Sequence, residues 1–132
     1  MNDQERQALI KAAQAARQYA YAPYSHYSVG AALLTTAGEI ITGCNVENAS
    51  YGGTICAERT AAVKAISVGQ RDFTAIAVVT ANGGAPCGIC RQFLYEFAPE
   101  LLVIIADEAG TVHAEMSLNA LLPRGFSPHS LP

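Results

Sequence analysis

The segment FTAIAVVTANGGAPCGICRQFLYEFAPELLVIIAD, residues 73–107, decides the fold of this chain. Its two ends, residues 73–81 and 101–107, are mostly apolar without alternation, which is typical of strands buried on both faces. Residues 87–99 between them have the pattern of a helix that ends before Pro99. A strand, a helix and a strand in this order predict a parallel pair of strands with a right-handed crossover.

The rest of the chain supplies three more strands. Residues 29–35 and 39–46 flank the short stretch TAG, in which Gly38 can take the positive φ of a hairpin loop. A last strand is predicted at residues 111–116, after the turn DEAG. The sheet should therefore have five strands, with parallel and antiparallel neighbours.

Two further long helices and one short helix are predicted. The first, over residues 3–19, has an apolar stripe and Asp3 as its cap. The second, over residues 55–69, stops at Gly69, and Ser117 can cap a short helix in LNALL. Because helices must cover both faces of the sheet, we expect an α/β fold, a three-layer α/β/α sandwich with a mixed five-stranded sheet.

Length and composition limit the class of protein. A chain of 132 residues that is 51% hydrophobic and 14% charged suits a single domain over residues 1–132 and excludes intrinsic disorder. Its net charge is −3 and no Lys or Arg cluster is present, which argues against a nucleic-acid partner. The low charge also indicates apolar surface that an oligomer would bury.

The sequence gives no sign of a secretory or membrane route. Charged residues interrupt the N-terminal stretch, so it lacks the apolar centre of a signal peptide. The longest aliphatic run, LLVIIA at 101–106, is far too short for a membrane span. We expect a cytoplasmic protein without a membrane partner, whose cysteines stay reduced and serve metal binding or catalysis.

Three cysteines stand at the starts of two predicted helices. Cys87 and Cys90 follow Pro86, and Cys56 begins the preceding helix. The free N–H groups and dipoles of helix N-termini stabilise thiolates. If the two helix starts meet, three thiolates surround one point and leave a fourth position open, which is the pattern of a catalytic zinc site. Glu58, in the first turn after Cys56, could then move protons to and from a water molecule.

Other interpretations of the cysteines remain open. A Cys-x-x-Cys pair can be a thioredoxin-like redox pair, although that motif normally lies in the first helix of its fold. Thioredoxin-like proteins also have no distant third cysteine followed two residues later by a glutamate, as Cys56 and Glu58 are here. Cys44 could complete a closed four-cysteine structural site with no room for water, or lie buried on its strand as a small hydrophobic side chain.

The motif CAE at 56–58 followed by PCGIC at 86–90 resembles the zinc-dependent cytidine deaminases. A cysteine stands at the first ligand position instead of a histidine, as in the small homotetrameric branch that acts on free nucleosides. The resemblance covers nearly the whole chain. It includes the stretches YAPYSHYSVGAAL (21–33), GCNVENASY (43–51), CAERTA (56–61), PCGICRQ (86–92) and LLPRGF (121–126).

The resemblance implies one Zn²⁺ per chain, held by Cys56, Cys87 and Cys90, with Glu58 as the general acid and base. Arg59 lies three residues after Cys56, on the same side of the helix. Three thiolates leave the zinc unit with a charge of about −1, which a cation beside the sulfurs offsets. The resemblance implies the same role for Arg59.

Further residues are expected to contact a substrate. Asn45 and Glu47 alternate along a strand end, so both can face one ligand, and an amide with a carboxylate suits ribose hydroxyls. In the family this motif holds the sugar 3′-hydroxyl. By the same resemblance, Tyr27 flanks the pyrimidine and the Ala57 N–H holds the O2 carbonyl of the base.

Two aromatic residues are expected to act across a subunit boundary. Phe126 aligns with an aromatic residue that a neighbouring subunit supplies, and Tyr51 lies in an active-site loop that subunits share. The resemblance therefore implies a homotetramer with shared active sites. His26, His113 and His129 match no metal motif and are expected at the surface.

The sequence thus predicts an enzyme, a hydrolytic deaminase of cytidine and 2′-deoxycytidine that releases ammonia in pyrimidine salvage. One alternative is a deaminase of another cytosine-containing small molecule such as blasticidin S, against which Phe126 and the sugar motif argue. An editing deaminase acting on polynucleotides is disfavoured by the acidic balance of the chain. The third alternative is a non-enzymatic module stabilised by a four-cysteine zinc site.

Overall fold

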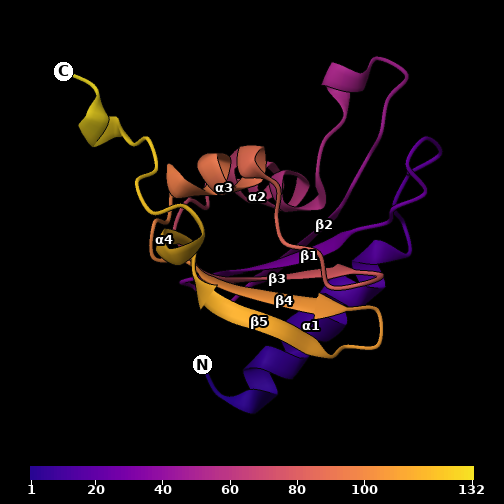
Figure 1. Ribbon diagram of the computed structural model, residues 1–132. Helices are drawn as coiled ribbons and strands as arrows, with labels where there is room; N and C mark the ends of the chain where they lie inside the picture. The colour runs from indigo at the N-terminus through magenta and orange to yellow at the C-terminus, as the bar shows by residue number, and fades with distance from the viewer.

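The computed structural model describes all residues from 1 to 132. Its five strands form one sheet in the order β2-β1-β3-β4-β5 (Figure 1). Only β3 and β4 are parallel, and the other neighbouring pairs are antiparallel, which confirms the mixed sheet and its parallel pair. The strands are β1 (Gly30–Thr35), β2 (Ile40–Cys44), β3 (Phe73–Thr80), β4 (Leu102–Asp107) and β5 (Val112–Ser117).

Helices cover both faces of this sheet. Helix α1 packs on one face, and α2 and α3 lie on the other (Figure 1). The three-layer α/β/α sandwich is therefore confirmed. No helix is both long enough and apolar enough to cross a membrane. The helices are α1 (Asp3–Arg17), α2 (Ala57–Ser67), α3 (Gly88–Tyr95) and α4 (Leu118–Leu121), with short 3₁₀ turns at Tyr51–Gly53 and Pro128–Ser130.

The alternation of strand side chains divides the core into two parts. On β1, Ala31 and Leu33 belong to the cluster under α2 and α3, whereas Ala32 belongs to the cluster under α1. All three side chains are fully buried. The central strands are therefore apolar on both faces, which explains why hydrophobic and polar residues do not alternate in their sequences.

Alanine fills most of the space between α2 and the sheet. Gly43 on β2 lies directly beneath this helix, and a Cβ added there would come within 2.5 Å of the Ala61 backbone nitrogen. Small side chains thus let the backbones of α2 and β2 lie close together. The fully buried residues on this side of α2 form the alanine layer: Ala57, Ala61, Ala62 and Ala65.

Some element ends differ from the prediction for local reasons. Asn2, and not Asp3, caps α1, because the Asn2 carboxamide accepts a hydrogen bond from the Glu5 N–H at 2.8 Å. Helix α3 ends at Tyr95, four residues before Pro99, and a tight turn follows it. Ser117 stands at the N-cap position of α4, but its side chain makes no capping hydrogen bond.

Candidate active site

Three cysteine sulfurs meet where α2 and α3 begin. Cys56 is the N-cap residue of α2, Cys87 is the N-cap residue of α3, and Cys90 lies in the first turn of α3. The Sγ atom of Cys87 is 3.6 Å from that of Cys56 and 3.5 Å from that of Cys90. All three sulfurs lie within 4.8 Å of one another. Neither N-cap cysteine uses its side chain to cap its helix, so both sulfurs are free to face a shared point.

This geometry fits a zinc ion. Ligand sulfurs about 2.3 Å from a tetrahedral centre lie about 3.8 Å apart, close to the separations found here. The Arg59 guanidinium adds a positive charge, since its Nη2 lies 3.5 Å from the Cys56 Sγ. Its Nε is buried and has no hydrogen-bond partner. The positive charge of the guanidinium is therefore partly buried, beside sulfurs that become negative as thiolates. The centre is therefore built for a metal held by thiolates.

The surroundings of Cys56 favour its thiolate. Hydrogen bonds from the Cys90 thiol, the Arg59 guanidinium and the Cys87 thiol lower the pKa of Cys56 to about 5. A thiolate is the form that ligates a metal, so one ligand is ready at neutral pH.

Glu58 is a buried carboxyl group next to this centre. Its side chain lies one residue inside α2, is only 3% exposed and lines the same cavity as Cys56 and Cys87. Burial raises the pKa of Glu58 to about 7, and the negative charge of Cys56 acts in the same direction. A carboxyl group with a pKa near neutrality can both accept and donate protons at physiological pH.

The cavity beside the cysteines has a volume of about 260 Å³. Its wall brings together six of the residues singled out in the sequence: Tyr27, Asn45, Glu47, Cys56, Glu58 and Cys87. These residues come from the turn before β1, the end of β2 and the starts of α2 and α3. The convergence of titratable and polar groups on a small concave site makes this cavity the candidate active site.

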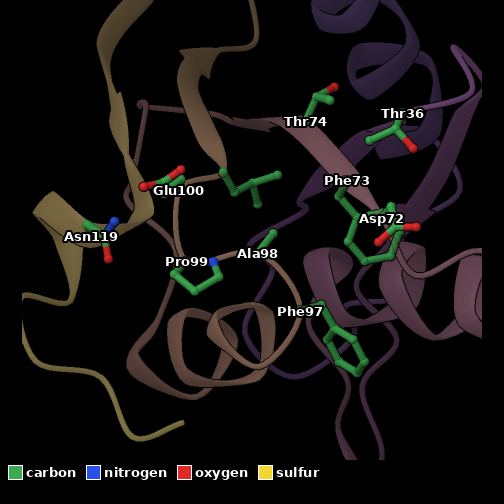
Figure 2. A pocket seen from close by; sticks show the side chains of 10 residues that line it. Thr36, Asp72, Phe73, Thr74, Phe97, Ala98, Pro99, Glu100 and Asn119 are labelled. Atoms are coloured by element: carbon green, nitrogen blue, oxygen red, sulfur yellow. The ribbon is translucent and has the colours of Figure 1, made fainter. Parts of the chain in front are cut away.

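A larger cavity of about 590 Å³ lies elsewhere, where β3 and β4 begin. Phe73, Phe97 and Glu100 contribute to its wall (Figure 2). It contains no cysteine and none of the predicted site residues. Its size therefore does not make it the site of the chemistry.

Asn45 and Glu47 shape the turn that borders the cavity. The Asn45 carboxamide accepts a hydrogen bond from the Val29 N–H at 2.9 Å and donates one to the Tyr27 carbonyl at 2.8 Å. Glu47 accepts hydrogen bonds from the N–H groups of Tyr24 and Ser25, and from the Ser25 hydroxyl. The Ser25 hydroxyl contributes most to lowering the pKa of Glu47. Both residues thus fix the backbone around Tyr27 as well as facing the cavity.

The other predicted substrate residues lie outside the wall of the cavity in this chain. Ala57 is fully buried, and as the first residue of α2 its N–H has no partner within the helix. Tyr51 is 77% exposed, and its ring lies 6.0 Å from the Tyr24 ring in an edge arrangement. Phe126 is 56% exposed, in a C-terminal tail that projects from the body of the protein (Figure 1).

Gln92 holds the tail at Phe126. Its carboxamide donates a hydrogen bond to the Phe126 carbonyl at 2.7 Å and accepts one from the Phe126 N–H at 3.1 Å. Arg91 bridges the Pro86 carbonyl at 2.8 Å and the Leu121 carbonyl at 3.1 Å. Helix α3 therefore anchors both the loop before Cys87 and the tail that carries Phe126.

Cys44 does not belong to the cysteine cluster. It lies on β2 beside a different cavity, formed between α1 and α2, and it is half-buried rather than fully buried. The expectation of a buried side chain was wrong, because β2 is an edge strand and α2 leaves part of it open. Without Cys44, the cysteine cluster keeps three members and an open fourth position.

Sequence reasoning missed six residues of the cavity wall. They come from four separate segments of the chain, and none has a residue type that by itself indicates chemistry, so the folded arrangement identifies them. Thr80, for example, ends a strand that reads as wholly structural. The six residues are Ser25, Val29, Thr54, Val78, Thr80 and Ala85.

Comparisons with known proteins agree with this site. Residues 3–106 match the family described as "Cytidine and deoxycytidylate deaminase zinc-binding region". A "Probable cytidine deaminase" of Dictyostelium discoideum is 48% identical over 134 residues, covering 99% of this chain and 90% of that protein. A "Cytidine deaminase" of Halalkalibacterium halodurans is 48% identical over 130 residues, covering 96% of this chain and 98% of that protein.

Solved structures give the same picture. The 1.6 Å crystal structure of cytidine deaminase from Burkholderia pseudomallei has a TM-score of 0.87 and 50% identity, and the match covers 96% of this chain and 100% of that one. The enzyme from Mycobacterium tuberculosis has a TM-score of 0.81 and 40% identity, over 96% and 98% of the two chains. With the family match spanning most of the residues and relatives this similar, the chain belongs to the cytidine and deoxycytidylate deaminase family.

Proposed function

We propose that this protein catalyses the zinc-dependent hydrolytic deamination of cytidine and 2′-deoxycytidine. The products are uridine or 2′-deoxyuridine and ammonia, as pyrimidine salvage requires. The observation that carries the proposal is a buried Glu58 in the same small cavity as a cluster of three cysteine sulfurs. The cavity of about 260 Å³ suits one nucleoside better than a polynucleotide.

Cys56, Cys87 and Cys90 hold one zinc ion per chain, and Arg59 partly neutralises their negative charge. Bound there, zinc supplies a Lewis acid that lowers the pKa of a water molecule to about 7. Cys44, outside the cluster, is left without a part in this site.

Glu58 moves the protons of the reaction. It takes a proton from the water that adds to C4 of the base and delivers it to N3. It then takes the second proton from the new C4 hydroxyl and delivers it to the C4 amino group. The C4–N bond breaks as the C4 carbonyl forms, and the amino group leaves as ammonia. Because Glu58 is buried and lies beside the sulfurs, each transfer occurs over a short distance and away from bulk water.

The remaining groups orient the nucleoside. Asn45 and Glu47 face the cavity and bind the ribose hydroxyls, while Tyr27 flanks the pyrimidine ring. The free N–H of Ala57 binds the O2 carbonyl of the base. Polar groups of this kind select against a ligand that leaves them unpaired.

We also propose a homotetramer in which Tyr51 and Phe126 of one subunit complete the site of a neighbour. Both rings are exposed in the single chain, as are the apolar side chains of Val68, just after α2, and Ile89 on α3. Exposed apolar side chains of this size on a small protein are typical of interfaces. Residues 1–132 would act as one catalytic domain in the cytoplasm, where thiol ligands stay reduced.

One assay tests the function. Purified protein is incubated with cytidine, and the loss of absorbance that accompanies uridine formation is followed with and without a zinc chelator. Chelator-sensitive turnover is expected. Blasticidin S is tested in parallel, and turnover of blasticidin S without turnover of cytidine would replace the nucleoside assignment. No turnover of either by zinc-loaded protein would favour the non-enzymatic module.

A further inference from the structure

We propose that Asn82 is a positioning residue for the base-binding wall of the active site, where it fixes the side chains of Tyr27 and Thr80. This inference rests on the proposed function, because it concerns the wall that the nucleoside base would contact. Asn82 lies in the loop at residues 81–86, between the end of β3 and Cys87. It does not line the cavity, although Tyr27 and Thr80 both do.

The Asn82 carboxamide oxygen is the meeting point of two wall residues. The Tyr27 hydroxyl donates a hydrogen bond to Asn82 Oδ1 at 2.7 Å, and the Thr80 hydroxyl donates a longer one to the same oxygen at 3.4 Å. The Thr80 hydroxyl also accepts a hydrogen bond from the Gly84 N–H at 2.8 Å. One amide oxygen therefore connects the turn before β1, the end of β3 and the loop that leads to Cys87.

This loop packs closely against Tyr27. A Cβ at Gly84 would clash with the Tyr27 hydroxyl oxygen, so the phenol lies directly against the glycine backbone. Gly83 has a φ of +76°, and a Cβ there would come within 2.6 Å of the His113 ring. The glycine pair thus packs against both the Tyr27 phenol and the His113 imidazole.

His113 is itself fixed from behind. Its Nε2 atom lies 2.8 Å from Asp107 Oδ2, while Asp107 Oδ1 accepts hydrogen bonds from the N–H groups of Ala109 and Thr111, each at 3.0 Å. The ring that backs Gly83 therefore cannot rotate freely. Because His113 supports Gly83 in this way, the loop keeps Asn82 Oδ1 within hydrogen-bonding distance of the Tyr27 hydroxyl.

The consequence for catalysis is a separation of effects. Asn82 touches neither a cysteine ligand nor Glu58. Loss of its carboxamide should leave metal binding and proton transfer intact and disturb only the placement of the base. A net hydrogen-bond contribution of ordinary size corresponds to a rise in KM of about threefold to tenfold. The value of kcat should stay within about twofold of wild type.

The experiment compares four variants with wild type. Asn82→Ala removes the acceptor, Tyr27→Phe removes a single donor oxygen, and Asn82→Asp keeps an acceptor and should rescue. Asn119→Ala, an exposed asparagine at the other cavity, is the matched control. Zinc content and melting temperature are measured for each. The double variant of Tyr27→Phe and Asn82→Ala should have a KM no higher than the worse single variant, because Asn82→Ala already removes the hydrogen bond that Tyr27→Phe removes.

Tyrosine-ring NMR of the substrate-free protein tests the contact between Asn82 and Tyr27 without turnover. Asn82→Ala should change the Tyr27 ring signals, and Asn119→Ala should not. If wild type turns over cytidine but Tyr27→Phe and Asn82→Ala leave KM unchanged, or their effects add fully, the inference is overturned. Unaltered Tyr27 ring signals in Asn82→Ala would also overturn it. If the ring signals change but wild type deaminates no nucleoside, the positioning of Tyr27 by Asn82 is supported and the proposed function is wrong.

Discussion

The sulfur atoms of Cys56 and Cys87 lie 3.6 Å apart, although 31 positions separate these residues in the chain. Each residue is the N-cap of a different helix, so two positive helix ends point at the same sulfurs. A site of this kind favours thiolates before any metal arrives, and the Arg59 guanidinium adds to the effect. Metal binding should therefore depend on these helix starts and not on the total number of cysteines.

Cys44→Ala should leave about one equivalent of zinc per chain, because Cys44 lies outside the cluster. Cys56→Ala, the matched change within the cluster, should lose most of the metal. Elemental analysis of both purified variants is the measurement. A loss of zinc from Cys44→Ala would contradict the open three-cysteine site and favour the closed four-cysteine alternative.

Glu58→Gln should retain its fold and its zinc but lose activity by more than the ~10²–10⁴ of an ordinary general acid or base. The physical reason is that, in the proposed mechanism, one carboxyl group serves several proton transfers in turn. Turnover of cytidine under saturating substrate, with zinc content as the control, gives the result. Activity within about tenfold of wild type would show that another group moves the protons.

Phe126→Ala should raise KM by about tenfold, since it removes the aromatic group that we propose closes a neighbour's cavity. Gln92→Ala should have a smaller effect in the same direction, because the two hydrogen bonds that hold the Phe126 backbone disappear while the ring remains. Zinc content should be unchanged in both variants. Steady-state kinetics with cytidine provides the measurement.

Mixed oligomers make the shared site testable. Co-expression of Glu58→Gln and Phe126→Ala chains should yield some complete sites, because under the shared-site proposal each chain supplies what the other lacks. The presence of both chains in one particle must first be shown by differential tagging. Activity no higher than that of the pure variants, or light scattering that finds an active monomer, would contradict the shared-site proposal.

Glu47 gives a prediction for pH. Hydrogen bonds from the Ser25 side chain and from the backbone of Ser25 and Tyr24 lower the pKa of Glu47 below its ordinary value of 4.5. A lowered pKa means that the folded state favours the carboxylate. This stabilisation is fully present above the unfolded pKa and disappears as the pH falls through the lowered pKa of the folded state.

Glu47→Gln should therefore melt at a lower temperature than wild type at neutral pH, and the difference should shrink as the pH falls below about 4.5. Thermal unfolding across this range, at a fixed zinc concentration, is the measurement. Glu100→Gln, which removes an exposed carboxylate at the other cavity, is the matched control. A difference that grows as the pH falls would show that the sign is wrong.

Strong patterns in the sequence were enough to predict the architecture. The apolar runs at 73–81 and 101–107 can bury their side chains only inside a sheet that is covered on both faces. In the structure, β3 and β4 form the parallel pair of this sheet. Helix ends were harder to predict. Asn2 and Asp3 are both good caps, and the choice between them depends on a single local hydrogen bond to Glu5.

The candidate site was predictable where spacing carries the chemistry. Cys56 and Glu58 stand on one helix start, and Cys87 stands on another, so their meeting follows from the strand order. The wall of the cavity was not predictable in the same way. Thr80 lines the cavity from the end of β3, and Ala85 lines it from the loop that follows, in which Gly83 has a positive φ. His113 was expected only as a surface residue, but its ring packs against Gly83 of that loop and is hydrogen-bonded to Asp107.

The alanine layer makes the metal centre sensitive to side-chain volume at a distance. Where backbones lie as close as those of Gly43 and Ala61, a larger side chain displaces the helix instead of filling a void. Displacement of α2 carries Cys56 with it, while Cys87 remains on α3. Substitutions such as Ala61→Val would thus appear first as faster escape of the metal, well before the protein unfolds. Added volume beneath α2, at a residue that binds no metal, would thus lower the affinity of the site for zinc.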